Sequence, residues 1–88
     1  MREKLRQYIL DEFLFGEGKV TDDQQLFETG VIDSLGFMKL IAFVEESFGV
    51  SLDMSEVTIE NFATIDAIVE TIESKKAEGG KGGGAARP

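Results

Sequence analysis

The chain of 88 residues contains no cysteine, no histidine and no tryptophan, and its one proline is the last residue. Without cysteine it can form neither a disulfide nor a thiolate metal site. Without histidine it lacks the commonest general base and the commonest metal ligand. A chain of this length makes one small domain, whose core is too small to hold a deep active site. The composition therefore argues against a self-contained enzyme.

Basic residues are scarce in the middle of the chain. The net charge is −8, and Lys39 is the only base between Val20 and Ser74, where acidic residues recur throughout. Such a surface repels nucleic acid and anionic membranes and attracts partners with basic patches. No apolar run is long enough to span a membrane, and the first four residues lack the apolar core of a signal peptide. We therefore expect a cytoplasmic monomer that binds neither nucleic acid nor membrane.

Apolar residues recur at helical spacing in three stretches, which predict helices over residues 2–14, over residues 34–48 and from Thr64 to about residue 76. The three apolar stripes consist of Leu5, Ile9 and Phe13; of Phe37, Leu40, Ile41, Val44 and Phe48; and of Ile65, Ile68, Val69 and Ile72. Phe43 fits neither face of the second helix. Glycines 16, 18 and 49 suit the ends of the first two helices.

A fourth, short helical turn is expected within residues 53–62, with Val57, Ile59 and Phe62 buried. The prediction is thus an all-α four-helix bundle with three longer helices and one short one. It occupies residues 1–76 as a single domain, and residues 77–88 form a flexible glycine-rich tail.

A long polar connection over residues 15–33 joins the first two predicted helices. We expect apolar side chains near its end to hold it against the bundle, namely Leu26, Phe27, Val31 and Ile32. Asp22 and Asp23 suggest calcium, but the spaced acidic ligands of a calcium loop are missing. No metal site is predicted.

The connection ends in Asp33-Ser34, directly before the second helical stripe. Both residues are good N-caps, so a helix should begin here. The start of a helix favours negative charge, and a phosphate on Ser34 Oγ would be stabilised there. The alternative is that Ser34 is an ordinary helix cap with no further role.

Three segments at fixed spacing surround Ser34. They are Asp23-x-x-Leu26-x-x-x-Gly30, then Ile32-Asp33-Ser34-Leu35, then Leu40-x-x-x-Val44-Glu45-Glu46-x-Phe48-Gly49-Val50. This pattern resembles the acyl carrier protein family, which includes peptidyl carrier domains, and the resemblance extends over roughly residues 5–74. It implies that Ser34 carries a covalent 4'-phosphopantetheine arm. It also implies that Asp33 helps the phosphopantetheinyl transferase and its Mg²⁺ to engage the site.

The second helix has a further face, away from its core stripe, formed by Leu35, Met38, Ala42, Glu45 and Glu46. We interpret it as a docking surface, with Leu35 and Met38 as apolar anchors and Glu45 and Glu46 steering basic partners. Gly36 is expected to let a partner or the arm approach the backbone closely. The alternative is a scatter of surface residues without function.

Ser34 does not have the surroundings of a catalytic nucleophile. There is no histidine to activate it, and the third residue after it is Phe37 rather than lysine. We therefore predict a discrete carrier protein, not an enzyme, that holds acyl or aminoacyl cargo as a thioester. Its partners are a phosphopantetheinyl transferase and loading and transfer enzymes with basic docking patches. The alternative is an acidic helical interaction module without a covalent cofactor.

Two residues of the docking helix differ from what is usual in carriers of primary fatty-acid synthesis. Gly36 stands where those carriers have an acidic residue, and Lys39 where they have glutamate. The resemblance thus favours a specialised pathway, such as secondary metabolism. The nature of the cargo, whether fatty acyl, aminoacyl or polyketide, stays open.

Overall fold

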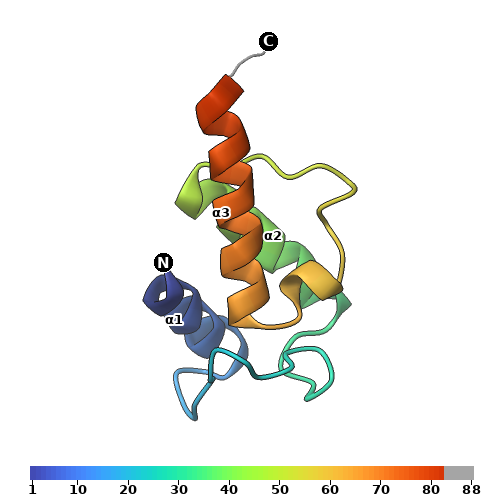
Figure 1. Ribbon diagram of the computed structural model, residues 1–88. Coiled ribbons are helices and arrows are strands. Elements are labelled where there is room, and N and C mark those ends of the chain that lie inside the picture. Colours follow the sequence, from blue (N-terminus) through green and yellow to red (C-terminus); the bar gives the residue numbers. More distant parts are fainter. Residues whose placement is uncertain (83–88) are drawn as a thin grey trace.

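A computed structural model describes residues 1–82, which form three α-helices and one 3-10 turn and contain no strand (Figure 1). The helices are α1 (Arg2–Phe13), α2 (Ser34–Phe48) and α3 (Ile65–Gly82), and the 3-10 turn is η1 (Glu60–Phe62). The all-α prediction is confirmed. The four-helix count is not, because only the short η1 forms in the region of the expected fourth helix.

Side chains in residues 53–61 bond to the backbone of the segment that leads into η1. Asp53 Oδ1 accepts from the backbone N–H of Ser55 at 3.0 Å, and Glu56 Oε1 accepts from that of Asp53 at 2.8 Å. Thr58 Oγ1 accepts from the N–H of Asn61 at 3.2 Å. These are bonds of the kind that cap the start of a helix, and here they accompany single short turns, at residues 54–56 and at η1.

The helix ends mostly agree with the capping residues in the sequence. Gly49 ends α2 in the left-handed conformation with φ 67°, where glycine is the preferred residue. Thr64 caps α3, because its Oγ1 accepts from the N–H of Ala67 at 3.0 Å. α3 continues past residue 76 to Gly82, so the first part of the expected tail is helical. The rest of that tail, residues 83–88, lies outside the described residues.

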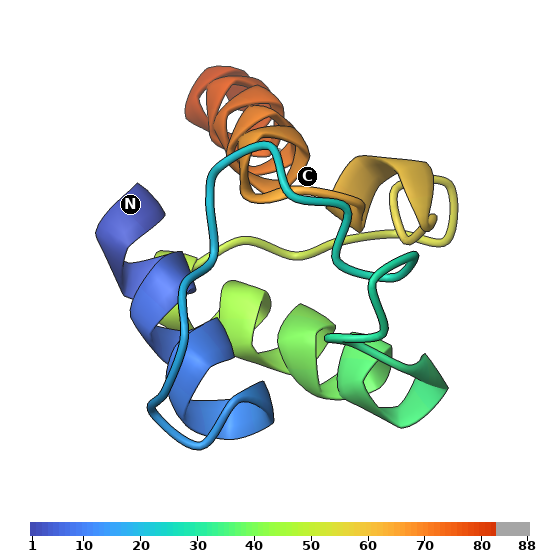
Figure 2. The ribbon, with the colours of Figure 1, turned by 90° about the horizontal axis from the view of Figure 1, so that it is seen from below.

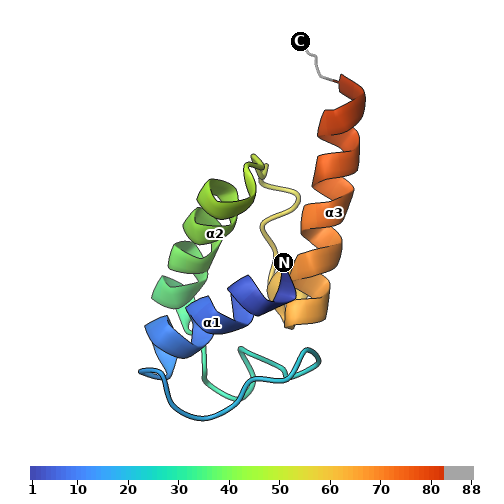
Figure 3. The same cartoon turned by 90° about the vertical axis from the view of Figure 1, so that its left-hand side faces the viewer.

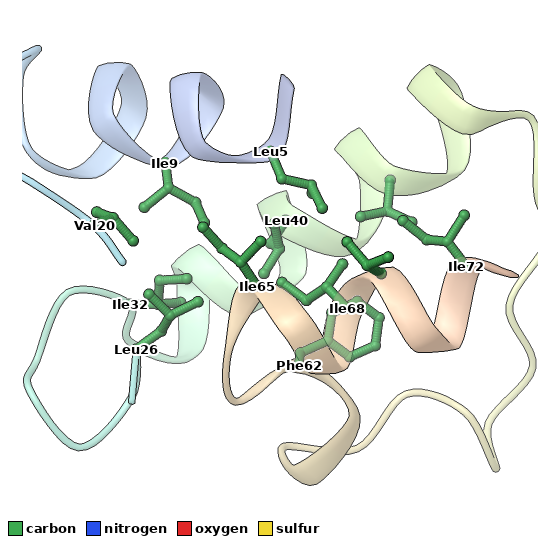
Figure 4. Packing of buried hydrophobic residues seen from close by; sticks show 12 residues of the cluster. Leu5, Ile9, Val20, Leu26, Ile32, Leu40, Phe62, Ile65, Ile68 and Ile72 are labelled. Carbon is green, nitrogen blue, oxygen red and sulfur yellow. The ribbon is translucent and has the colours of Figure 1, made fainter. Parts of the chain in front are cut away.

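The core gathers apolar residues from all three helices, from η1 and from the connection between α1 and α2 (Figure 4). Its fully or nearly buried members are Leu5, Ile9, Val20, Leu26, Ile32, Leu40, Val44, Phe62, Ile65, Ile68, Val69 and Ile72. Phe37, Ile41 and Phe48 of the predicted stripe are partly buried against it. The expected burial of Ile59 is wrong: it is 57% exposed at the start of η1, where Phe62 alone turns into the core.

The connection over residues 14–33 lies against the N-terminal end of α3, as Figure 2 shows from below. The N–H of Leu26 donates to the carbonyl of Ala63 at 2.8 Å, and the N–H of Asp66 donates to the carbonyl of Asp22 at 3.0 Å. Arg6 of α1 forms an ion pair with the Asp22 carboxylate. These bonds hold the long connection on the bundle and so position its last residues, which lead into Ser34.

α1 and α2 contact each other in opposite chain order. The side chain of Lys4 lies over the Phe48 ring, and Glu12 pairs with Lys39 at 3.2 Å. Between them Tyr8 stacks on Phe43 with ring centroids 3.9 Å apart. This stacking explains Phe43, which fitted neither face of the helix. The C-terminal end of α1 therefore lies at the N-terminal end of α2 (Figure 3).

Candidate functional site

The site is built around the first residues of α2. Asp33 has extended backbone, and its Oδ1 accepts from the N–H of Gly36 at 2.8 Å. Its carbonyl accepts the first helical bond, from the N–H of Phe37, also at 2.8 Å. Asp33 is therefore the N-cap. Ser34 is the first residue of the helix and is not needed as its cap.

The Ser34 side chain is exposed to solvent. Among the side chains that the structure describes, none forms a hydrogen bond with its hydroxyl. The first N–H groups of any α-helix lack intrahelical partners and form the positive end of the helix dipole. A phosphate attached to Ser34 Oγ would thus lie at an end of the helix that favours negative charge. The residues present fit a phosphate-linked group at Ser34.

Gly36 has a different role from the expected one. It is buried, and a Cβ atom at this position would lie 2.6 Å from Cε1 of Phe13 and 3.2 Å from Cγ2 of Ile32. The space beside its backbone is thus filled from within the molecule. Gly36 allows α1 to pack against the start of α2, and the expectation that it lets a partner approach is wrong.

The second face of α2 is exposed, as its sequence pattern predicts. The side chains of Leu35 and Met38 are 73% and 69% exposed, and Glu46 is exposed as well. Glu45 is only partly exposed, and its Oε2 accepts from the N–H of Leu52 at 2.9 Å. This bond, which sequence reasoning missed, ties the segment after α2 to the helix. Of these two carboxylates, Glu46 is therefore the more accessible to solvent.

A shallow groove beside Ser34 runs between the end of α1 and the start of α2. It is lined by Glu12, Phe13, Asp33, Leu35, Gly36, Met38 and Lys39. Lys39, the one base of α2, lies 3.2 Å from Glu12 Oε2. The ion pair offsets the positive charge of Lys39 on an otherwise acidic helix face. The pairing was not apparent from the sequence, because the two residues lie on different helices.

The two aspartates considered for calcium are used otherwise. Asp22 pairs with Arg2 and Arg6, and Asp23 accepts from the hydroxyl of Thr21 at 2.9 Å. Within residues 1–82, no group of three or more potential ligands could hold a metal ion. Nor does any helix in that range combine the length and apolar character needed to cross a membrane.

Comparison with known proteins agrees with this geometry. The family model described as "Phosphopantetheine attachment site" matches residues 3–72, a range that includes Ser34 and most of the bundle. The chain is 35% identical over 86 residues to "Probable acyl carrier protein PigG" of Serratia sp. (strain ATCC 39006), covering 97% of this chain and 99% of that protein. It is 38% identical over 73 residues to a "D-alanyl carrier protein" of Streptococcus uberis (strain ATCC BAA-854 / 0140J), covering 78% of this chain and 91% of that protein.

Proposed function

Because this chain belongs to the family of proteins with a phosphopantetheine attachment site, we propose that Ser34 is the residue that carries the arm. The protein is a carrier with no catalytic role of its own, and phosphopantetheine is its covalent cofactor. The observation that carries the assignment to Ser34 is its place at the start of α2. Its hydroxyl is exposed and free of hydrogen bonds to the described side chains, while Asp33 forms the cap.

The arm supplies a thiol that holds cargo as a thioester. The chain has no cysteine and so has no thiol of its own. During attachment, Ser34 Oγ forms a bond to one phosphorus atom of the coenzyme A diphosphate, the atom to which pantetheine is linked. The bond from this phosphorus to the bridging anhydride oxygen breaks, adenosine 3',5'-bisphosphate leaves, and the hydroxyl proton passes to the transferase. We propose that the exposed Asp33 carboxylate assists at this step by facing the transferase and its Mg²⁺.

Carrier proteins interact with a phosphopantetheinyl transferase and with loading and transfer enzymes. We propose that these partners bind the second face of α2, where Leu35 and Met38 supply exposed apolar area. Glu46, assisted by Glu45, would attract basic patches on the partner. Glu45 keeps its charge, but its side chain is partly buried and bonded to the Leu52 N–H, so it is less accessible to a partner than Glu46.

The cargo we propose is an acyl or aminoacyl group within a specialised pathway. One of the two relatives is named a probable acyl carrier and the other a D-alanyl carrier, so both kinds of cargo occur among proteins similar to this chain. A specialised pathway is favoured by Gly36 and Lys39 of α2, which differ from the residues usual at these positions in carriers of primary fatty-acid synthesis. We propose that the protein works in the cytoplasm as a monomer.

The test is the intact mass of the protein before and after incubation with coenzyme A, Mg²⁺ and a broad-specificity phosphopantetheinyl transferase. We expect a gain of one phosphopantetheine that maps to Ser34 and is lost in Ser34→Ala. Ser51→Ala is the matched control, since Ser51 is also exposed but lies outside the site. If folded protein without an arm gains none with several transferases, Ser34 is only a helix residue and the adaptor alternative holds.

A further inference from the structure

Phe15 has an unusual backbone conformation and an unusual exposure. Its φ is 56°, and among residues 1–82 it is the one residue other than glycine with a positive φ. Its side chain is 88% exposed. The left-handed region disfavours residues with a Cβ atom, and an exposed ring gains little from burial. Neither the backbone nor the core of the domain accounts for phenylalanine at this position.

The end of α2 provides an internal comparison. The left-handed residue that directly follows α2 is Gly49, whereas α1 is followed first by Leu14, which is not left-handed, and then by Phe15, the first left-handed residue of that turn. The turn after α1 is held by its own backbone: Gly16 N–H donates to the Leu10 carbonyl at 2.8 Å, and Glu17 N–H donates to the Leu14 carbonyl at 3.0 Å. Glycine would suit this turn better than Phe15, so the ring itself requires an explanation.

The turn that holds Phe15 lies at the Ser34 end of α2. Two residues before it, Phe13 packs against Gly36, with 2.6 Å between its Cε1 and the position of a Cβ atom there. Glu12, next to Phe13, reaches Lys39 of α2. The end of α1 and the start of α2 lie at one end of the bundle (Figure 3). Phe15 follows the first of these segments and Leu35 and Met38 belong to the second, and all three have exposed apolar side chains.

Acidic residues border these apolar side chains. Four acidic residues belong to these segments: Asp11 and Glu12 at the end of α1, Glu17 in the turn after it, and Asp33 as the cap of α2. Glu12 also offsets the charge of Lys39. Asp11 Oδ1 lies 3.9 Å from the position of a Cβ atom on Gly16, so its carboxylate faces the turn. The complementary partner surface is an apolar socket bordered by cations.

We propose that Phe15 is an anchor for the phosphopantetheinyl transferase, an inference that rests on the proposed attachment at Ser34. The transferase must bring its active site to Ser34 Oγ itself, whereas loading enzymes act on the far end of the arm. Its surface therefore meets the end of the bundle where Phe15 lies. Exposed aromatic side chains are frequent anchors because they bury a large area for few rotatable bonds.

The experiment measures the rate of arm addition by intact mass as a function of carrier concentration, with coenzyme A saturating. Phe15→Gly and Phe15→Asn remove the ring while suiting the left-handed turn. We expect kcat/KM to fall about tenfold in both, through KM and with kcat unchanged, because the chemistry at Ser34 is untouched. Phe15→Tyr, which keeps the ring, should stay close to the wild type. Met54→Ala is the matched control, since Met54 is 90% exposed on another segment and should not matter.

Two results would overturn the inference while leaving the proposed function intact: wild-type kinetics in Phe15→Gly and Phe15→Asn, or an equal loss in Met54→Ala. If the wild type gains no arm at Ser34, the proposed function fails and the inference fails with it. The melting temperature of each variant shows that it folds. Should Phe15→Gly lower it, the comparison of Phe15→Asn with Phe15→Tyr decides.

Discussion

At the scale of single residues, the start of α2 depends on two neighbours with different tasks. Asp33 caps the helix, with its Oδ1 on the Gly36 N–H, and Ser34 keeps an exposed hydroxyl. The sequence predicts a helix start here but leaves open which residue is the cap, since both types are common in that position. The division of tasks is consistent with Ser34 being available for modification. It also means that Ser34→Ala should remove the attachment atom without removing the cap.

Gly36→Ala tests the packing of α1 on α2. Alanine is the better helix former, so an exposed glycine within a helix would gain stability from this change. Here the new methyl group would lie 2.6 Å from the Phe13 ring, and overpacking should prevail. We expect the free energy of unfolding in urea to fall by about 1 kcal/mol.

The control for that experiment is the double variant Gly36→Ala/Phe13→Leu, which removes the ring from the contact. If the steric argument holds, Gly36→Ala should cost less in the Phe13→Leu background than in the wild type. An increase in stability on Gly36→Ala alone would show that the helices separate easily and that the contact is not tight.

Tyr8 should report on alkaline pH. Burial against Phe43 raises the pKa of its phenol above the ordinary value of about 10, and the charge of Glu12 adds to this. Because the folded pKa exceeds the unfolded one, this contribution to stability is fully present below pH about 10 and is lost as the pH rises through the folded pKa. The chain has one tyrosine and no tryptophan, so ultraviolet absorbance follows this phenol alone.

We therefore expect the phenolate absorbance of the folded protein to appear at higher pH than that of the protein in denaturant. Tyr8→Phe should remove the part of the alkaline destabilisation that is due to this group. Glu12→Gln is the matched change in charge, and it should lower the folded pKa slightly. Identical titration curves for folded and denatured protein would contradict the burial argument.

At the scale of secondary-structure elements, the α-helices were predictable because their apolar residues repeat at helical spacing. The observed α1 and α2 differ little from the predicted ranges, and the core stripe of α2 is the predicted one. The form of the segment between α2 and α3 was not predictable, because it depends on bonds between side chains and backbone. Asp53, Glu56 and Thr58 cap single short turns there, and Glu45 binds the N–H of Leu52. Hydrophobic periodicity carries no information on such bonds.

The exposed face of α2 leads to a prediction about charge. Glu46→Lys should weaken the association with the transferase, and the loss should be larger at low salt than at high salt, because salt screens exposed charges. Surface plasmon resonance at two ionic strengths measures both affinities. Glu73→Lys, an equal charge change at an exposed position of α3, is the matched control. Equal losses in the two variants would mean that net charge alone attracts partners, and no loss in either would exclude steering by this face.

At the scale of the whole molecule, bases near the N-terminus hold distant parts of the chain together. Arg2 forms ion pairs with Asp22 and Asp66, and Arg6 pairs with Asp22, so α1, the long connection and the start of α3 meet at one place. Lys75 pairs with Glu56 at 3.0 Å across a partly buried contact. The sequence shows the excess of acids over bases. It does not show which acids are paired, since the partners lie far apart along the chain and meet only in the fold.

The last prediction concerns the length of α3. Its last residue in the buried cluster is Ile72, and beyond the pair of Lys75 with Glu56 the helix extends past the rest of the bundle (Figure 1). A chain shortened to end at Lys76 should therefore melt within about 2 °C of the full chain, because it keeps the whole described core cluster and the pair of Lys75 with Glu56. Ile72→Ala in the full chain is the control, and it should cost at least 2 kcal/mol, or roughly 10 °C, because it opens a cavity in the core. If the shortened chain melts as low as Ile72→Ala, the residues after Lys76 pack against the domain, and the boundary of the carrier domain lies beyond residue 76.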